Sequence, residues 1–141
     1  MMPPRCGVWF HGTQRGGTWQ RDPAHPGIWF ANRRVAAQWY AAGGSIVQAT
    51  LMERPLLNLK DPADLWLLLH RSGHWEHRAK IRHWHARGQL YLLQEGAVQN
   101  ALVAAAFASH PGLIMQDCTA GVKHLSLVVH QDRLNETITR R

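Results

Sequence analysis

The chain has 141 residues, with 16 Lys and Arg against nine Asp and Glu, a net charge of +7 and ten histidines. This length suits one domain that buries roughly two-thirds of the surface exposed by the unfolded chain. The apolar runs are far shorter than the ~20 residues of a membrane span, and the N-terminus has no apolar signal core. We therefore expect a single cytoplasmic domain over residues 1–141.

The cysteine count excludes two classes of protein, and the charge indicates the kind of partner without identifying it. The cysteines, Cys6 and Cys118, are too few for a disulfide framework and lack the paired spacing of a thiolate zinc site. The positive charge favours acidic partners such as nucleic acid. The Lys and Arg are nevertheless spread along the chain, with one denser stretch at 71–87, so charge alone does not identify a partner.

Apolar segments and turn residues predict the elements in the first half of the chain. Three segments have the composition of strands and lie at 7–10, 27–30 and 45–52. Gly, Pro and Asp predict a loop over 12–26. Asn32 is the expected N-cap of a helix that runs through Ala42 and ends at Gly43-Gly44.

The second half is expected to contain an edge segment, three helices and two strands. Residues 56–59 have the features of a short edge segment. The helices are expected at 61–70, capped by Asp61 or Asp64, at 74–87 and at 98–109. The final strands are expected at 113–116 and 125–130, joined by a loop over 117–123. The predicted fold class is α+β rather than a doubly wound sheet.

Two motifs at strand ends resemble a known family. The first is Phe10-His11-Gly12-Thr13, and the second is Gly27-Ile28-Trp29-Phe30-Ala31 with Ala37 and Tyr40 on the helix behind it. In this order they resemble the ADP-ribosyltransferase superfamily, in its poly-ADP-ribose-polymerase-like or diphtheria-toxin-like branch. The resemblance covers both ends of the chain and leaves 60–110, expected to be helical, unmatched. It implies an ADP-ribosyltransferase-like split β-sheet core with peripheral helices.

The resemblance also implies a site for NAD as substrate. His11 is implied to bind the ribose hydroxyls of the nicotinamide half, and the backbone of Gly12 to hold the carboxamide. Thr13, the next residue of the motif, is included among the NAD-binding residues. Tyr40 is implied to stack on the nicotinamide ring, an offset contact that favours a cationic ring. Trp29 stands where the family usually has tyrosine, so it can stack but lacks the phenol hydroxyl.

The catalytic acid is the main departure from the family. Cleavage of NAD at the nicotinamide–ribose bond develops positive charge on the ribose, which a carboxylate stabilises. The family usually carries this acid at the start of the last strand, where this chain has Lys123-His124-Leu125. We assign the role to Asp117, which with His11 forms the predicted catalytic pair; alternatively, Asp117 caps a turn with Gly121. The acids next in line are Glu53, Glu95 and Glu136.

The same residues have a structural interpretation. His11 can be a core histidine bonded to backbone, and Trp29, Trp39 and Tyr40 can be core aromatics, as stripes at helical spacing usually are. Trp39 and Tyr40 are expected on different faces of their helix, so only one of them is expected at the pocket.

The segment 74–85 is rich in His, Trp and Arg. Its imidazoles match no usual zinc ligand set, so no metal is expected; they are His74, His77, His83 and His85. We expect a solvated basic helix that docks on a macromolecular target through Trp75 and Trp84. Interleaved Arg and Trp also suit single-stranded nucleic acid.

The sequence thus predicts an NAD-dependent mono-ADP-ribosyltransferase that transfers one ADP-ribose unit to a macromolecule. A protein acceptor is favoured over nucleic acid, and no membrane partner is expected. The compact chain resembles the single-domain transferases that act as effectors, toxins or phage-encoded proteins. The alternative is a degenerate member of the same fold that binds NAD or nucleic acid without chemistry.

Overall fold

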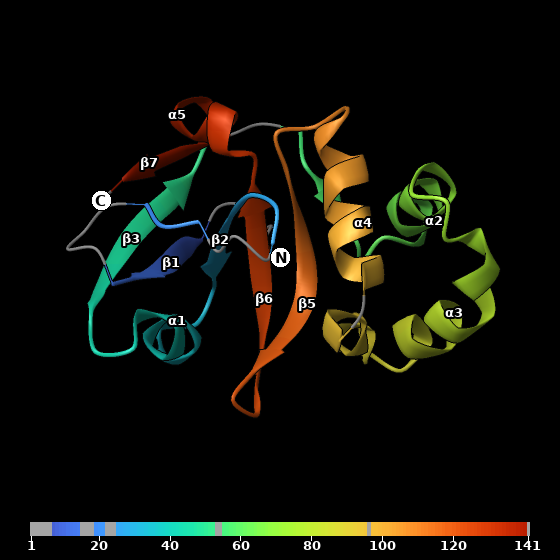
Figure 1. Cartoon of the computed structure of the whole chain (residues 1–141), viewed down its shortest axis with the longest axis horizontal. Helices are drawn as coiled ribbons and strands as arrows, with labels where there is room; N and C mark the ends of the chain where they lie inside the picture. The colour runs from blue at the N-terminus through green and yellow to red at the C-terminus, as the bar shows by residue number, and fades with distance from the viewer. Residues whose placement is uncertain (1–6, 15–18, 22–24, 53–54, 96, 141) are drawn as a thin grey trace.

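The computed structural model describes residues 7–14, 19–21, 25–52, 55–95 and 97–140. These residues form one seven-stranded sheet of order β4-β5-β6-β2-β1-β3-β7 with helices around it (Figure 1). The strands are β1 (Val8–Thr13), β2 (Ile28–Ala31), β3 (Ser45–Leu51), β4 (Leu57–Asn58), β5 (Gly112–Thr119), β6 (Val122–Val129) and β7 (Ile138–Arg140). The α-helices are α1 (Arg34–Ala41), α2 (Pro62–Arg71), α3 (Arg78–Ala86), α4 (Ala97–Phe107) and α5 (Leu134–Thr137). Short 3-10 turns are η2 (Trp75–His77), η3 (Leu90–Glu95) and η4 (Gln131–Arg133).

The mixture of helices and strands confirms the coarse prediction of the fold class. Figure 1 shows α2, α3 and α4 gathered beside β5, whereas α1 lies against β1 and β3 at the other half of the sheet. All strand pairs are antiparallel except β4 with β5. No helix in the described part of the chain is long and apolar enough to span a membrane.

The contact between β1 and β2 is the weakest join in the sheet. These strands share a single register pair, Phe10 with Ala31. By contrast, β1 pairs with β3 along its whole length, and β2 pairs with β6 at every residue. The two halves of the sheet, β4-β5-β6-β2 and β1-β3-β7, are therefore joined at this single pair and diverge beyond it.

Two core clusters cover opposite faces of the sheet. One packs leucines of α2 and α4, including Leu68 and Leu102, against Leu113 of β5. The other gathers aromatic and aliphatic side chains such as Phe30 and Leu127 on the far face. Neighbouring residues of β5 and β6 alternate between the clusters because successive side chains of a strand point to opposite faces. Each buried leucine contributes about 1.5–3 kcal/mol. The far-face cluster also contains Trp9 of β1 and Leu51 of β3, so it is the cluster that packs across both halves of the sheet.

The β5–β6 hairpin corrects the sequence prediction for residues 113–130. The strands pair continuously from Gly112 opposite Val129 to Thr119 opposite Val122, so the expected loop over 117–123 is wrong. The turn needs only Ala120 and Gly121, whose φ angles of 49° and 80° are both left-handed, as a two-residue hairpin turn of the primed type requires.

The helix caps were predicted in part. Asp61 caps α2 by accepting a hydrogen bond from the Ala63 amide at 2.9 Å, as expected. Asn32 does not cap α1, because its side-chain oxygen accepts from the amide of Leu125 at 2.9 Å. The N-cap of α1 is Arg33, which makes no side-chain capping bond. The sequence prediction missed η3, α5 and β7.

Candidate functional site

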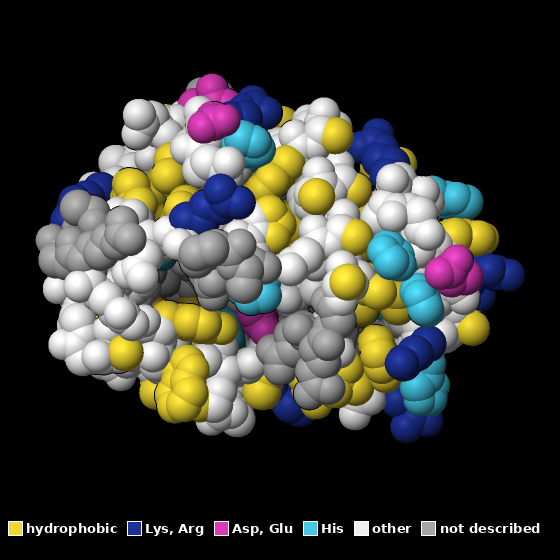
Figure 2. Space-filling model, viewed as in Figure 1, with side chains coloured by type: hydrophobic (Ala, Val, Ile, Leu, Met, Phe, Trp, Pro, Cys, Tyr) yellow, Lys and Arg dark blue, Asp and Glu magenta, His cyan; other side chains and the backbone are white. Residues whose placement is uncertain are grey.

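A cavity of about 490 Å³ opens where β1 and β2 diverge, within the size range of small-molecule sites. Five of the six predicted site residues line it: His11, Gly12, Trp29, Tyr40 and Asp117. These side chains come from β1, β2, α1 and β5. Figure 2 looks onto a hollowed face of the molecule, where histidine and acidic side chains lie beside hydrophobic ones.

Thr13 is the predicted residue that does not line the cavity. Its side chain is fully buried, and its hydroxyl donates to the side-chain oxygen of Gln20 at 3.4 Å. The same oxygen accepts from the amide of Gln14 at 2.8 Å. Thr13 therefore helps to hold Gln20 against the end of β1.

His11 joins the two halves of the sheet. Its Nδ1–H donates to the carbonyl of Trp29 at 2.8 Å, and its Nε2 accepts from the amide of Gln20 at 2.9 Å. Rings of Trp19 and Phe30 lie 5.5 and 5.4 Å from the imidazole. Burial lowers the pKa of His11, and the bond to Trp29 opposes that shift. The imidazole is therefore neutral, and both nitrogens are bonded to backbone.

The packing of α1 against β1 leaves no room for a side chain at Gly12. A Cβ at this position would lie 2.1 Å from the carbonyl oxygen of Ala37 and 2.7 Å from the amide nitrogen of Ala41. The close approach of α1 to β1 therefore requires glycine, independently of any ligand. The same approach brings Tyr40 of α1 to the edge of the cavity.

Trp39 and Tyr40 both border the cavity, so the expectation that only one of them reaches it is wrong. Their side chains are 63% and 53% exposed, because the last turn of α1 lies at the rim and neither face is covered.

Trp29 of β2 forms another part of the cavity wall. Its indole N–H donates to the carbonyl of Pro26 at 2.9 Å, which fixes the ring in the cavity lining.

Asp117 is a buried carboxylate in the middle of the hairpin. One oxygen accepts from the hydroxyl of Ser126 at 2.7 Å, and the other accepts from the amide of Cys118 at 2.8 Å. Its register partner is His124. Because the turn lies at 120–121 and neither donor belongs to it, Asp117 does not cap that turn. Asp117 is the acid among the cavity residues, and the described lining contains no Lys or Arg.

A second hydrogen-bonded chain was missed by the sequence prediction. His124 donates from Nδ1 to the carbonyl of Leu125 at 3.0 Å, so its Nε2 accepts from the hydroxyl of Thr119 at 2.8 Å. Thr119 in turn lies 3.4 Å from the hydroxyl of Tyr40, which becomes the donor. Because the Leu125 carbonyl can only accept, it fixes which atom donates and which accepts in each hydrogen bond of this series, from His124 to Tyr40.

The signal for these residues was present in the sequence. Polar residues recur at every second position on both sides of Ala120-Gly121, at 117, 119, 124 and 126. With a two-residue turn they share one face of the hairpin. Three of the four, Asp117, His124 and Ser126, line the cavity, as does the buried Gln99 of α4.

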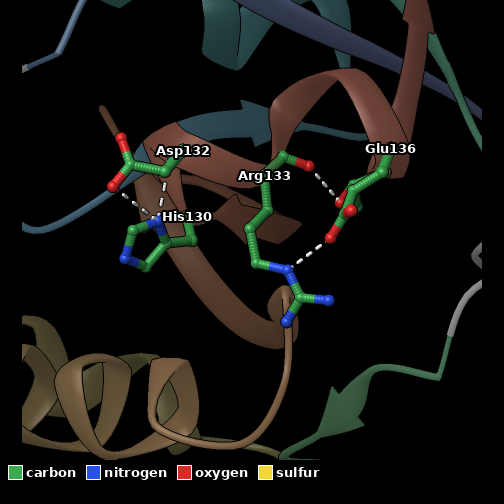
Figure 3. A network of polar contacts seen from close by, with 5 residues as sticks. His130, Asp132, Arg133 and Glu136 are labelled. Atoms are coloured by element: carbon green, nitrogen blue, oxygen red, sulfur yellow. Dashed lines mark hydrogen bonds and ion pairs between the residues drawn. The ribbon is translucent and has the colours of Figure 1, made fainter.

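Of the other candidate acids, Glu136 is the one with a described side chain, and it does not line the cavity. Glu53 lies outside the described residues, as does the side chain of Glu95. Glu136 belongs to a surface network near the C-terminus, shown in Figure 3, where it forms an ion pair with Arg133. In the same network, the imidazole of His130 accepts from the amide of Asp132 at 3.1 Å.

The histidines of the segment 74–85 separate in the structure. Ligand atoms of His74, Glu76 and His77 lie within 4.8 Å of one another, in a group with one half-buried and two exposed members. His85 instead bonds to the carbonyl of Lys60 at 2.9 Å.

Comparison with protein-family models, with curated proteins and with solved structures finds no match for this chain.

Proposed function

We propose that the protein is a mono-ADP-ribosyltransferase that uses NAD as substrate. The observation that carries the proposal is the common cavity of His11, Gly12, Trp29, Tyr40 and Asp117. His11 and Asp117 are 106 positions apart in the sequence, yet all five residues border one space of the size that small-molecule sites have. The divergence of β1 from β2 also suits the split sheet that the family resemblance implies.

The proposed reaction breaks the bond between nicotinamide nitrogen and ribose C1. The electron pair of that bond goes to nicotinamide, which leaves as a neutral molecule. An oxygen or nitrogen of the acceptor forms the new bond to C1 and loses its proton to solvent or to a carboxylate. Asp117 supplies the negative charge that stabilises the positively charged ribose during this exchange, because its two oxygens are fixed by Ser126 and Cys118.

The aromatic walls of the cavity suit the nicotinamide end of NAD. The exposed ring of Tyr40 is held at its hydroxyl by Thr119, and Trp29 is held at its indole nitrogen by Pro26. Fixed aromatic faces attract a cationic ring more strongly than a neutral one. This preference favours NAD over the nicotinamide that is released.

For His11 to bind the ribose, one of its existing hydrogen bonds must be replaced. Its Nε2 already accepts a hydrogen bond from the Gln20 amide, so a ribose hydroxyl binds there only by replacing that donor. The exchange of one hydrogen bond for another costs little when the freed amide finds a new partner. The same contact supports the second candidate function, a degenerate module in which His11 is structural.

The chain carries Lys123-His124-Leu125 where polymer-forming relatives carry the terminal acid. We therefore propose the transfer of one ADP-ribose unit. The test is incubation of the purified protein with NAD and a cell lysate, followed by detection of ADP-ribose on protein and on nucleic acid separately. Labelling by the wild type and its loss in His11→Ala are expected, with a thermal melt to establish that the variant folds. A folded wild type that labels neither fraction and is not stabilised by millimolar NAD contradicts the proposal.

A further inference from the structure

A second, shallower groove adjoins the cavity. It has a volume of about 230 Å³ and is lined in part by Asp117 and His124, which also line the first cavity. The two spaces therefore meet at this register pair of the hairpin. A group bound in the groove can therefore reach the same Asp117 that borders the cavity.

The groove forms where η3 packs against the hairpin. The amide of Leu90 donates to the side-chain oxygen of Gln116 at 3.3 Å, which fixes η3 beside β5. Tyr91 follows and presents its ring to the groove, with the ammonium of Lys123 5.3 Å from the ring centroid. Arg33 lines the same groove. A flat ring and two cations thus surround a space with room for one base-sized group.

The cations of the groove have no acidic partners among the described residues. Ion pairs are formed by other residues, at His77, His130 and Arg133. Among the described residues, the Asp117 carboxylate, which also lines the groove, accepts from the Ser126 hydroxyl and the Cys118 amide. Arg33 and Lys123 outnumber this one carboxylate in the described lining, so the groove has a positive charge that favours an anionic ligand.

Further cations lie on α3, whose C-terminal end meets the groove. Arg87 is the C-cap of α3, and the next residue, Gly88, lines the groove. Three cations of α3 lie over indole rings at 4.8–5.3 Å: Arg78 over Trp75, Lys80 over Trp84 and Arg82 over Trp66. Arg78 and Arg82 share one face of the helix, being four residues apart, and Lys80 lies on the other face. These contacts hold the cationic groups without neutralising them. No carboxylate pairs with them in the described part of the chain.

We propose that the groove is a binding site for single-stranded nucleic acid, which is the acceptor of the transferase reaction. Phosphates lie along α3, and one nucleotide enters the groove beside Tyr91. Cations interleaved with aromatic rings are the pattern that binds single strands, and the small groove excludes a duplex. An acidic protein segment matches the charge but makes no use of the ring. This inference rests on the proposed function for the transfer step and is independent of it for binding.

The transfer step balances with groups already named. A base nitrogen or hydroxyl oxygen of the nucleotide forms the bond to ribose C1. Its proton passes to Asp117 or to solvent, and nicotinamide leaves with the electron pair of the broken bond. Asp117 borders both spaces, so one carboxylate faces the ribose and the incoming nucleophile.

The test measures binding of fluorescent single-stranded DNA and RNA oligonucleotides by anisotropy in the absence of NAD. The groove variant is Arg33→Gln with Lys123→Gln, tested also as the two single substitutions. The control for each single substitution is Arg140→Gln, which removes one exposed cation on β7 at the far edge of the sheet. Thermal melts establish that all variants fold. We expect the groove variant to bind at least tenfold more weakly and the control within about twofold. For the groove variant, the fall of log affinity with log salt should be less steep by about 1.4, which is about 0.7 for each of the two lost phosphate contacts.

Two results overturn the inference: no binding of either oligonucleotide at low salt, or equal losses of affinity in the groove variant and the control. Labelling of protein but not of oligonucleotides by NAD also overturns it, while leaving the transferase proposal intact. Conversely, oligonucleotide binding that depends on Arg33 and Lys123 without any consumption of NAD supports the groove and refutes the transferase proposal. The two failures are therefore distinguishable.

Discussion

Replacing Asp117 by asparagine removes the negative charge of the cavity with almost no change in shape. Asp117 is buried and accepts two hydrogen bonds, one on each oxygen. Asparagine keeps one oxygen to accept from the Cys118 amide, and its NH2 can donate to the Ser126 hydroxyl, which reverses that hydrogen bond. The hydroxyl proton of Ser126 then loses its acceptor, so the expected cost in folding free energy is about 1 kcal/mol, at the low end of the range for a buried unpaired donor.

The effect on the reaction is expected to be larger than the effect on folding. A fixed group that stabilises transition-state charge is worth about 10²–10³ in rate. Asp117→Asn should therefore release nicotinamide from NAD at least about a hundredfold more slowly at saturating NAD. NAD affinity should change little, because the charge acts mainly when the ribose becomes positive.

The assay follows nicotinamide release at several NAD concentrations and pairs it with urea unfolding of each variant. Ser126→Ala is the matched control, because it removes one hydrogen bond to Asp117 and keeps the charge. We expect the control to lose less than about tenfold in rate at a similar cost in stability. A folded Asp117→Asn protein with wild-type turnover refutes the assigned role, and equal losses in both variants make the residue structural.

Three further predictions test the packing, the buried histidine and the basic helix. Gly12→Ala should lose about 1–3 kcal/mol or more in urea unfolding, since its Cβ meets the backbone of α1; unchanged stability contradicts the packing argument. Because burial lowers the pKa of His11, the unfolded chain binds more protons below pH ~6.5. Wild-type stability should therefore fall on acidification through that window more steeply than that of His11→Asn, and parallel curves exclude a buried neutral imidazole. Arg78→Glu with Arg82→Glu should reduce labelling of the acceptor and leave NAD affinity within about threefold; weaker NAD binding, measured by calorimetry, assigns α3 to the NAD site.

The strands around the cavity were predictable because their local signals agree with the fold. Apolar runs bounded by glycine and polar residues mark β1, β2 and β3 to within three residues at each end. Asp61 followed by proline marks the start of α2. In these segments the turn chemistry, the cap and the buried pattern all point to the same element, so no tertiary information was needed.

The hairpin was misjudged because its polar residues serve the cavity. Asp117 and His124 have the composition of a loop, yet they pair across β5 and β6 and face a polar space. Asn32 shows the same effect at a helix end, where a tertiary partner on Leu125 takes the side chain away from its local capping role. Local propensity fails in such places because the competing partner is distant in sequence.

The contact of Gln20 with His11 could not be predicted from the sequence. It joins a residue of β1 to a residue nine positions away, in the segment predicted as a loop, where no periodic pattern fixes which residue meets the strand. The motif around His11 therefore indicated the location of the cavity, while the state of the imidazole required coordinates. The His11→Ala variant tests whether this bonded imidazole serves the reaction or only the structure.

The most direct measurement of the central claim uses NAD labelled separately on the nicotinamide ring and on the adenine ring. Purified protein is incubated with each form and with single-stranded oligonucleotide, acidic protein or neither. A mono-ADP-ribosyltransferase releases labelled nicotinamide and attaches the adenine label to a macromolecule in equal amounts, one unit for each modified site. Release of nicotinamide with the adenine label left in solution indicates hydrolysis of NAD instead. Intact NAD in every mixture, from a protein that is folded, contradicts the transferase account.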